Sequence, residues 1–198
     1  MSLFRTPLIV LDTETTGLLK DPQATPWEIA AVALDEQGQE VDHVSILGRP
    51  DPWREDMRRI VALGHIDPDE VLAAPPLAER LPELLSWLNR HLSGGARITA
   101  FNVDFDQPML SRCGVDLFGR AWAPCIMAAA KKVMGPAGAL PWMGYLRDYK
   151  NPRLQDEAAP FFGVAPQEPA HRALADARTA ALIAVALQQR ALAAREAS

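Results

Sequence analysis

An apolar run at residues 8–11 ends abruptly in two acidic residues, Asp12 and Glu14. Residues i and i+2 of a β-strand face the same side, so both carboxylates can reach one metal ion while Thr13 faces away. Two carboxylates this close repel each other unless a cation lies between them. Oxygen ligands without thiolates or clustered histidines favour Mg²⁺ or Mn²⁺ over zinc. The run therefore predicts a strand end that presents acids to a divalent ion; the alternative is two solvated acids at a surface strand end.

Two further polar groups lie where strands and helices are expected to meet. Asp104 and Asp106 follow a strand expected at residues 96–102; Asp104 is also a candidate helix N-cap, and the residues alone do not separate the two acids. His171 and Asp176 open the last expected helix. At about 100° per residue they lie on different sides of a regular helix, so both can face one site only when His171 precedes the helix. For His171 the alternative is an exposed or capping histidine.

Hydrophobic periodicity predicts a mixed α/β chain folded as one domain, residues 1–198. Strands are expected at residues 7–14, 28–34, 41–47 and 96–102, with a fifth strand or short apolar run near 122–127. Helices are expected at residues 77–88 with the regular part starting near Pro82, at 104–112, in an alanine-rich segment ending at 134, and at 154–162 and 173–194. An antiparallel three-strand meander followed by alternating helices and strands predicts a mixed sheet with helices on its faces.

The composition is that of an ordinary globular protein, with 48% hydrophobic and 23% charged residues. The longest apolar stretches fall short of the roughly 18 residues of a membrane span, and no signal peptide is recognised, so we expect a cytoplasmic protein without membrane contact. Cys113 and Cys125 lack a metal-binding spacing and are expected to be reduced. The net charge of −5 does not exclude a nucleic-acid partner, because two divalent ions would offset about four negative charges at the acids.

The three acidic segments together resemble a known enzyme family. LIVLDTETTGL at residues 8–18, AFNVDFDQPML at 100–110 and HRALADARTAA at 171–181 are similar, in order and spacing, to the three exonuclease motifs of the DEDDh superfamily, which includes the proofreading subunit of bacterial DNA polymerase III, ribonuclease T and oligoribonuclease. The resemblance implies a ribonuclease-H-like fold and hydrolysis of nucleic acid from the 3′ end to nucleoside 5′-monophosphates. It implies two Mg²⁺ ions, for which Mn²⁺ can substitute, a general base at His171, and catalytic metal-binding acids at Asp12, Glu14, Asp106 and Asp176.

The resemblance also implies which residues meet the substrate. Thr15 would meet the terminal 3′-OH and Leu18 would pack against the terminal base. The full implied substrate-binding set is Thr13, Thr15, Leu18, Asn102 and Phe105. The two threonines that flank Glu14 are more similar to the DNA-proofreading branch than to oligoribonuclease. Single-stranded DNA 3′ ends are therefore favoured over RNA, with a role in DNA repair or proofreading.

Departures from the family pattern leave alternatives open. Phe101 stands where a histidine is frequent, and Pro124 and Cys125 replace a frequent Asp-Thr pair; these changes affect substrate fit and no catalytic position. The alternatives are an RNA-directed exonuclease of the same superfamily and a non-catalytic polymerase-accessory protein that binds nucleic acid. The short stretch after Asp176 favours a stand-alone nuclease, while a polymerase or homodimer contact stays open. A haloacid-dehalogenase-like phosphatase is disfavoured, because its later acidic pair and lysine are not recognised.

Residues 142–153 combine aromatic rings with cations. The favoured interpretation is that Trp142 and Tyr145 hold a loop over the core while the charges are solvated. The alternative is a platform on which the bases of a single strand stack and where cations pair with phosphates.

Overall fold

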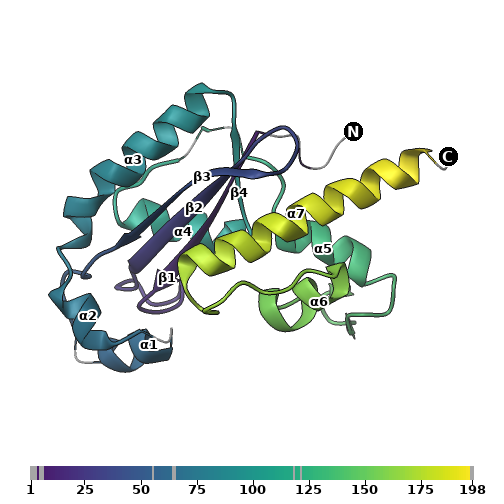
Figure 1. The fold of residues 1–198 in the computed structure, drawn as a ribbon. Coiled ribbons are helices and arrows are strands. Elements are labelled where there is room, and N and C mark those ends of the chain that lie inside the picture. Colours follow the sequence, from purple (N-terminus) through teal and green to yellow (C-terminus); the bar gives the residue numbers. More distant parts are fainter. Residues whose placement is uncertain are drawn as a thin grey trace.

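The computed structural model describes residue 4 and residues 7–54, 56–63, 66–117, 119–120 and 122–196 (Figure 1). Its strands are β1 (Leu8–Thr15), β2 (Pro26–Leu34), β3 (Glu40–Leu47), β4 (Arg97–Ala100), β5 (Trp142–Met143) and β6 (Asp148–Tyr149). Its helices are α1 (Met57–Leu63), α2 (Pro68–Ala73), α3 (Leu77–Ser93), α4 (Val103–Arg112), α5 (Ile126–Met134), the π-helix η1 (Leu154–Ala158), α6 (Ala159–Phe162) and α7 (Ala173–Glu196). Among these helices, none combines the length and apolar character that a bilayer crossing requires.

The main sheet has the strand order β3-β2-β1-β4. β1 pairs antiparallel with β2 and β2 pairs antiparallel with β3, whereas β4 runs parallel to β1. The sheet is therefore mixed, which confirms the expected fold class. Because β1 and β4 are parallel neighbours, their carboxyl ends meet at the same sheet edge. The acids that follow β1 and β4 in the sequence are thus brought to one place.

Two hydrophobic cores lie on opposite faces of the sheet, because successive residues of β1 point to opposite sides. Leu8 and Val10 pack with residues of α5, α6 and α7. Ile9 and Leu11 pack with residues of α3 and α4. Figure 1 shows the resulting layers, with α3 and the long α7 on different sides of the strands. Continued alternation along β1 places Asp12 and Glu14 on the α7 side and Thr13 on the α4 side.

Two elements differ from the sequence expectation. α3 begins at Leu77 instead of near Pro82, and Pro82 lies inside it. The burial of Leu77 and Leu81 against the sheet offsets the hydrogen bond that proline cannot make. The apolar run near residues 122–127 makes only an isolated parallel bridge, between Trp122 and Ile98, and α5 already begins at Ile126. Only residues 123–125 lie between the bridging Trp122 and the first residue of α5, which is too short for a strand.

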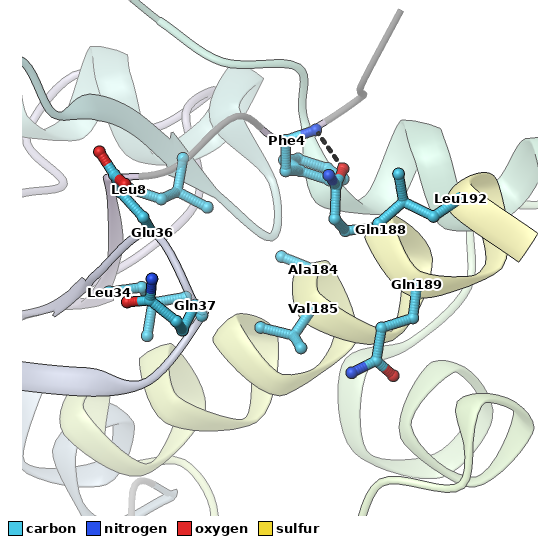
Figure 2. A pocket seen from close by; sticks show the side chains of 11 residues that line it. Phe4, Leu8, Leu34, Glu36, Gln37, Ala184, Val185, Gln188, Gln189 and Leu192 are labelled. Carbon is cyan, nitrogen blue, oxygen red and sulfur yellow. Dashed lines mark hydrogen bonds between the residues drawn. The ribbon is translucent and has the colours of Figure 1, made fainter.

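A cavity of about 160 Å³ lies between the N-terminal segment, the β2–β3 turn and the second half of α7 (Figure 2). Its wall includes Leu34, Ala184 and Leu192, and the backbone N–H of Phe4 donates to Oε1 of Gln188 at 3.2 Å. Ala184 follows Asp176 by eight residues, which is about 12 Å along a helix. This cavity is therefore separate from the acids at the sheet edge.

Candidate active site

Three carboxylates converge where the end of β1 meets the start of α7. One carboxylate oxygen from each of Asp12, Glu14 and Asp176 lies within 4.8 Å of the other two. Asp12 and Glu14 share a face of β1, as their spacing predicts. Asp176 reaches them because α7 packs on β1 and β2 through small residues, among them Ala177 and Ala180, which are buried. Small side chains let a helix lie close to a sheet, so the helical acid comes within reach of the strand acids.

Asp106 approaches from the other face of the sheet. It lies in the first turn of α4, is 3% exposed, and accepts a hydrogen bond from the Thr13 hydroxyl at 2.7 Å. Thr13 faces away from Asp12 and Glu14, as expected, and its buried side chain is engaged with Asp106. Asp104 is exposed in the same turn. Burial thus distinguishes the two acids, and it is Asp106 that turns inward.

The acids strongly disfavour one another's ionised forms. Burial, followed by repulsion from Asp106 and Glu14, raises the pKa of Asp12 well above its usual value. Burial and repulsion from Asp176 raise the pKa of Glu14 to about 8. Burial raises the pKa of Asp106 to about 7 against the hydrogen bond from Thr13, and burial also raises that of Asp176. Clustered carboxylates of this kind gain most from a divalent cation, because only the cation both replaces lost hydration and removes the repulsion.

The donor set fits a hard divalent ion. Every group in the cluster offers carboxylate oxygen, the ligand type that Mg²⁺ and Mn²⁺ prefer. Both cysteines, Cys113 and Cys125, lie outside the cluster and hydrogen-bond to backbone carbonyls instead. The residues present therefore suit magnesium or manganese better than a thiophilic metal.

His171 lies immediately before α7, as its spacing from Asp176 requires. Its backbone is left-handed, with φ of 61°, a conformation that is uncommon for residues other than glycine. The side chain of His171 is exposed. Its backbone N–H donates a hydrogen bond to Oδ1 of Asp176 at 3.3 Å. The backbone bond fixes the start of α7 to a member of the acidic cluster. The backbone of His171 therefore lies beside Asp176 despite their five-residue separation.

A buried ion pair holds this helix start in place. The Glu28 side chain is 3% exposed and accepts from Nη2 of Arg172 at 2.8 Å and from Nε at 3.0 Å. The same carboxylate accepts from the N–H of Ala173 at 3.1 Å. Glu28 pairs directly with Glu14 in the β1–β2 register. Sequence reasoning did not assign Glu28 a role, although a single charged residue within the apolar run of β2 was a visible signal.

A second polar contact reaches the cluster from η1. Nε2 of Gln155 donates to Oδ1 of Asp176 at 2.6 Å. The other end of this amide, Oε1, is buried without a hydrogen-bond partner in the described part of the chain. Gln155 and His171 therefore share one oxygen of Asp176, which leaves Oδ2 of that carboxylate for another ligand. Nothing in the local sequence around Gln155 indicated this contact.

The residues expected to meet the substrate lie on the same chain segments as Glu14 and Asp106. Thr15 ends β1 and its hydroxyl donates to the carbonyl of Gly17 at 2.8 Å. Leu18 follows in an exposed loop and is 60% exposed. Asn102 and Phe105 lie at the start of α4, half-buried, and α4 packs on β1.

The loop that carries Leu18 is held by one side chain that sequence reasoning missed. Arg112, the last residue of α4, donates to the carbonyl oxygens of Leu19 and Asp21, each at 2.7 Å, and to that of Ala24 at 3.1 Å. The loop after β1 and the helix after β4 are thus joined. Both border the same sheet edge.

Comparison with known proteins identifies the family. The family model RNase_T, described as an exonuclease, matches residues 9–184. No curated protein sequence matches the chain significantly. Apart from Leu8, all three motif segments, including the acids at the sheet edge, fall inside the matched range.

Solved structures share the fold at low sequence identity. Cell-death related nuclease 4 (CRN-4) superposes with a TM-score of 0.70 at 18% identity over 96% of this chain and 64% of its own. The nuclease domain of 3′hExo, a DEDDh family member bound to rAMP, gives 0.68 at 16% identity over 92% of both chains. E. coli Exonuclease I in complex with a dT13 oligonucleotide gives 0.64 at 18% identity over 96% of this chain and 42% of its own. The chain therefore spans less than two thirds of CRN-4 and less than half of Exonuclease I.

Proposed function

Since the chain belongs to the RNase_T exonuclease family, we propose that it is a metal-dependent 3′→5′ exonuclease. The substrate is single-stranded nucleic acid, with DNA preferred, and the products are nucleoside 5′-monophosphates. The observation that carries the proposal is the convergence of Asp12, Glu14 and Asp176 within 4.8 Å, beside the buried Asp106. These acids come from distant stretches of the chain, and their mutual repulsion has no structural benefit without a cation.

Two divalent ions would be held by four carboxylates, those of Asp12, Glu14, Asp106 and Asp176. The ions would be Mg²⁺, for which Mn²⁺ can substitute. When bound there, such ions would supply activation of water, neutralisation of the phosphate and stabilisation of the departing oxygen in an in-line displacement. The protein's own part is to fix the acids before the substrate arrives. The Thr13 hydroxyl orients Asp106, and the Gln155 amide orients Asp176.

His171 is the general base in this proposal. An imidazole titrates near neutral pH, which suits removal of a proton from the attacking water. Its exposed side chain precedes α7, and the bond from its N–H to Asp176 keeps it beside the acids. The Glu28–Arg172 pair fixes the next residue along the chain. The base is therefore positioned by buried contacts while its ring stays accessible to substrate.

The 3′ end would enter between the loop after β1 and the start of α4. Thr15 would meet the terminal 3′-OH, Leu18 would pack against the terminal base, and Asn102 and Phe105 would border the next nucleotide. Among the structural neighbours, Exonuclease I is seen with a DNA oligonucleotide and 3′hExo with a ribonucleotide. The fold therefore accommodates both deoxyribonucleotides and ribonucleotides. The preference for DNA rests on the threonines flanking Glu14.

The test is a nuclease assay with 3′- and 5′-labelled single-stranded DNA, duplex DNA and short RNA, each with Mg²⁺, Mn²⁺ or EDTA. We expect stepwise loss of nucleotides from the 3′ end of single-stranded DNA and none in EDTA. Asp12→Asn should abolish turnover. Activity that survives both EDTA and Asp12→Asn, or release from the 5′ end, would refute the proposal.

The role of His171 has a matched control. His171→Ala should lower kcat by about 10²–10⁴-fold, the usual range for loss of a general base, and added imidazole should restore part of it. His43→Ala alters another exposed histidine, on β3, and should leave kcat unchanged. An equal change of kcat in the two variants would exclude His171 as the general base.

A further inference from the structure

Exposed apolar side chains gather on a small hairpin between α5 and η1. Trp142 is 57% exposed, Tyr145 78% and Leu146 60%. They are three of the seven large hydrophobic residues that are exposed among the described residues, yet they lie within five consecutive positions. Clustered apolar groups in water usually mark a binding surface. The expectation that Trp142 and Tyr145 hold this segment over the core is therefore wrong, because both side chains are mostly exposed and it is Tyr149 that packs against the core.

The hairpin has a defined conformation. β5 and β6 pair antiparallel, with Trp142 opposite Tyr149, and their rings meet edge to face at 5.1 Å. Tyr149 lies over the end of α5, where a Cβ at Gly135 would come within 2.3 Å of the tyrosine ring. Lys131 of α5 binds the side chains of Asp148 and Asn151. Tyr149 is thus the half-buried member of the ring pair, and Trp142 lies outside it and is more exposed.

The same region is basic in an acidic protein. Residues 126–153 contain five lysines and arginines against one acid, whereas the rest of the chain has 15 basic and 24 acidic residues. Lys132, Arg147 and Lys150 are exposed on this segment. Within the described residues, Lys132 and Arg147 take part in no ion pair, and Lys150 contacts Glu157 at 3.2 Å. Surfaces that bind single-stranded nucleic acid combine positive charge with exposed aromatic rings.

We propose that the hairpin surface, defined as Lys132, Trp142, Tyr145, Leu146, Arg147 and Lys150, binds the single strand upstream of the nucleotide being removed. This inference rests on the proposed function. Bases stack on Trp142 and Tyr145, and the cations pair with phosphates. An apolar surface alone would suit a protein partner equally, but the excess of cations on a chain of net charge −5 is complementary to a polyanion.

The hairpin is connected to the site through η1. Gln155 follows Tyr149 by six positions, so their Cα atoms lie within about 22 Å of each other even for a fully extended chain. Gln155 in turn contacts Asp176 at 2.6 Å, and Glu157 of η1 contacts Lys150. A strand several nucleotides long can therefore reach from the acidic site to the hairpin surface.

The test compares long and minimal substrates. Affinity for fluorescein-labelled oligothymidylates of 4 to 20 nucleotides is measured by anisotropy in EDTA, where no turnover occurs. Turnover of the p-nitrophenyl ester of thymidine 5′-monophosphate, which reaches only the acidic site, is measured with Mn²⁺. Tyr145→Ala should weaken binding of the long strand by about 5- to 150-fold, the range for one stacked base, and leave ester turnover unchanged. Trp142→Phe, which keeps a ring, should retain most of the affinity, and Trp142→Ala should not.

Controls separate stacking, charge and folding. Leu192→Ala and Arg195→Ala alter exposed residues in the last turns of α7 and should change neither assay. Arg147→Ala should reduce the slope of log affinity against log salt by about 0.7, as expected for one lost phosphate contact on a single strand. Unchanged ester turnover and thermal midpoint in the hairpin variants show that they are folded.

Two results would overturn the inference. One is an unchanged affinity for the 20-mer in Tyr145→Ala and Trp142→Ala. The other is a wild-type dimer in light scattering that the same substitutions convert to monomer with no loss of oligonucleotide affinity, which would make the surface a contact between copies. If the wild type cleaves neither ester nor oligonucleotide, the proposed function fails, while the binding measurement in EDTA still decides the role of the hairpin.

Discussion

Removal of the Glu28 carboxylate should destabilise the packing of the first turn of α7 against β2. In Glu28→Ala, Arg172 loses all of its hydrogen bonds to the carboxylate and the backbone N–H of Ala173 loses its acceptor. Breaking a buried ion pair costs about 3–5 kcal/mol, and the lower end applies because the Arg172 side chain is 26% exposed. Repulsion between Glu28 and the acids at Asp12 and Glu14 is relieved at the same time, which offsets part of the cost. We therefore expect a loss of about 2–3 kcal/mol in the free energy of unfolding without metal, or about 4–12 °C in the thermal midpoint.

The effect of Glu28→Ala should also depend on bound Mn²⁺ and should extend to catalysis. When Mn²⁺ neutralises the acids, the relief of repulsion disappears, so Glu28→Ala should lower the thermal midpoint more in Mn²⁺ than in EDTA. Displacement of His171 should lower kcat by about 10- to 100-fold, because misplacement of a catalytic group by about 1 Å is that costly. KM for a single-stranded oligonucleotide should change little. Differential scanning calorimetry and steady-state kinetics give both quantities.

The chain contains a matched control for burial. Glu40 and Arg178 form a pair of the same geometry, with Nη2 to Oε1 at 2.7 Å and Nε to Oε2 at 3.0 Å, but its side chains are 31% and 34% exposed. Glu40→Ala should cost about 0–1 kcal/mol and leave kcat unchanged. A midpoint shift in Glu28→Ala no greater than in Glu40→Ala, or a normal kcat, would refute the assignment of Glu28 as a positioning residue.

Two further predictions concern the acids. Without divalent cation, the thermal midpoint should fall as pH rises from 4.5 to about 8, because the pKa of Glu14 is raised from 4.5 to about 8 and the folded protein retains a proton that the unfolded chain has released. Calorimetry in EDTA measures the fall, and saturating Mn²⁺ should abolish it; a midpoint that rises with pH in EDTA would contradict the prediction. Thr13→Val removes the 2.7 Å bond to buried Asp106 and should cost about 1–3 kcal/mol in urea unfolding, while Thr13→Ser should restore most of it. Equal stability of the two variants would show that the bond contributes nothing.

The strands and the placement of acids within one segment were predictable from sequence because their signals are local, whereas the convergence of the three acidic segments was implied only by the family resemblance. The i, i+2 spacing of Asp12 and Glu14 on a strand determines that they share a face, and the five-residue spacing of His171 and Asp176 requires the histidine to precede the helix. The structure confirms both. The choice of Asp106 over Asp104 was not local, since it depends on which side of α4 faces Thr13 across the sheet.

The features that sequence analysis did not predict depend on contacts between distant segments of the chain. The start of α3 five residues before Pro82 is determined by packing of its first turn on the sheet, which a local rule for proline does not capture. Gln155 and Arg112 act through side-chain contacts 21 or more residues away, and neither lies in a recognisable motif. Residues 142–149 were read as a loop held down by its rings, because periodicity does not show which face of a two-residue strand is covered.

The most direct measurement is anomalous diffraction from crystals of the protein soaked in Mn²⁺ with a nucleoside 5′-monophosphate. The account predicts strong peaks within bonding distance of carboxylate oxygens of Asp12, Glu14 and Asp176, which are already within 4.8 Å of one another, with the nucleotide phosphate beside them and His171 facing it. Manganese bound elsewhere, or no peak between these three side chains at saturating Mn²⁺, would contradict it.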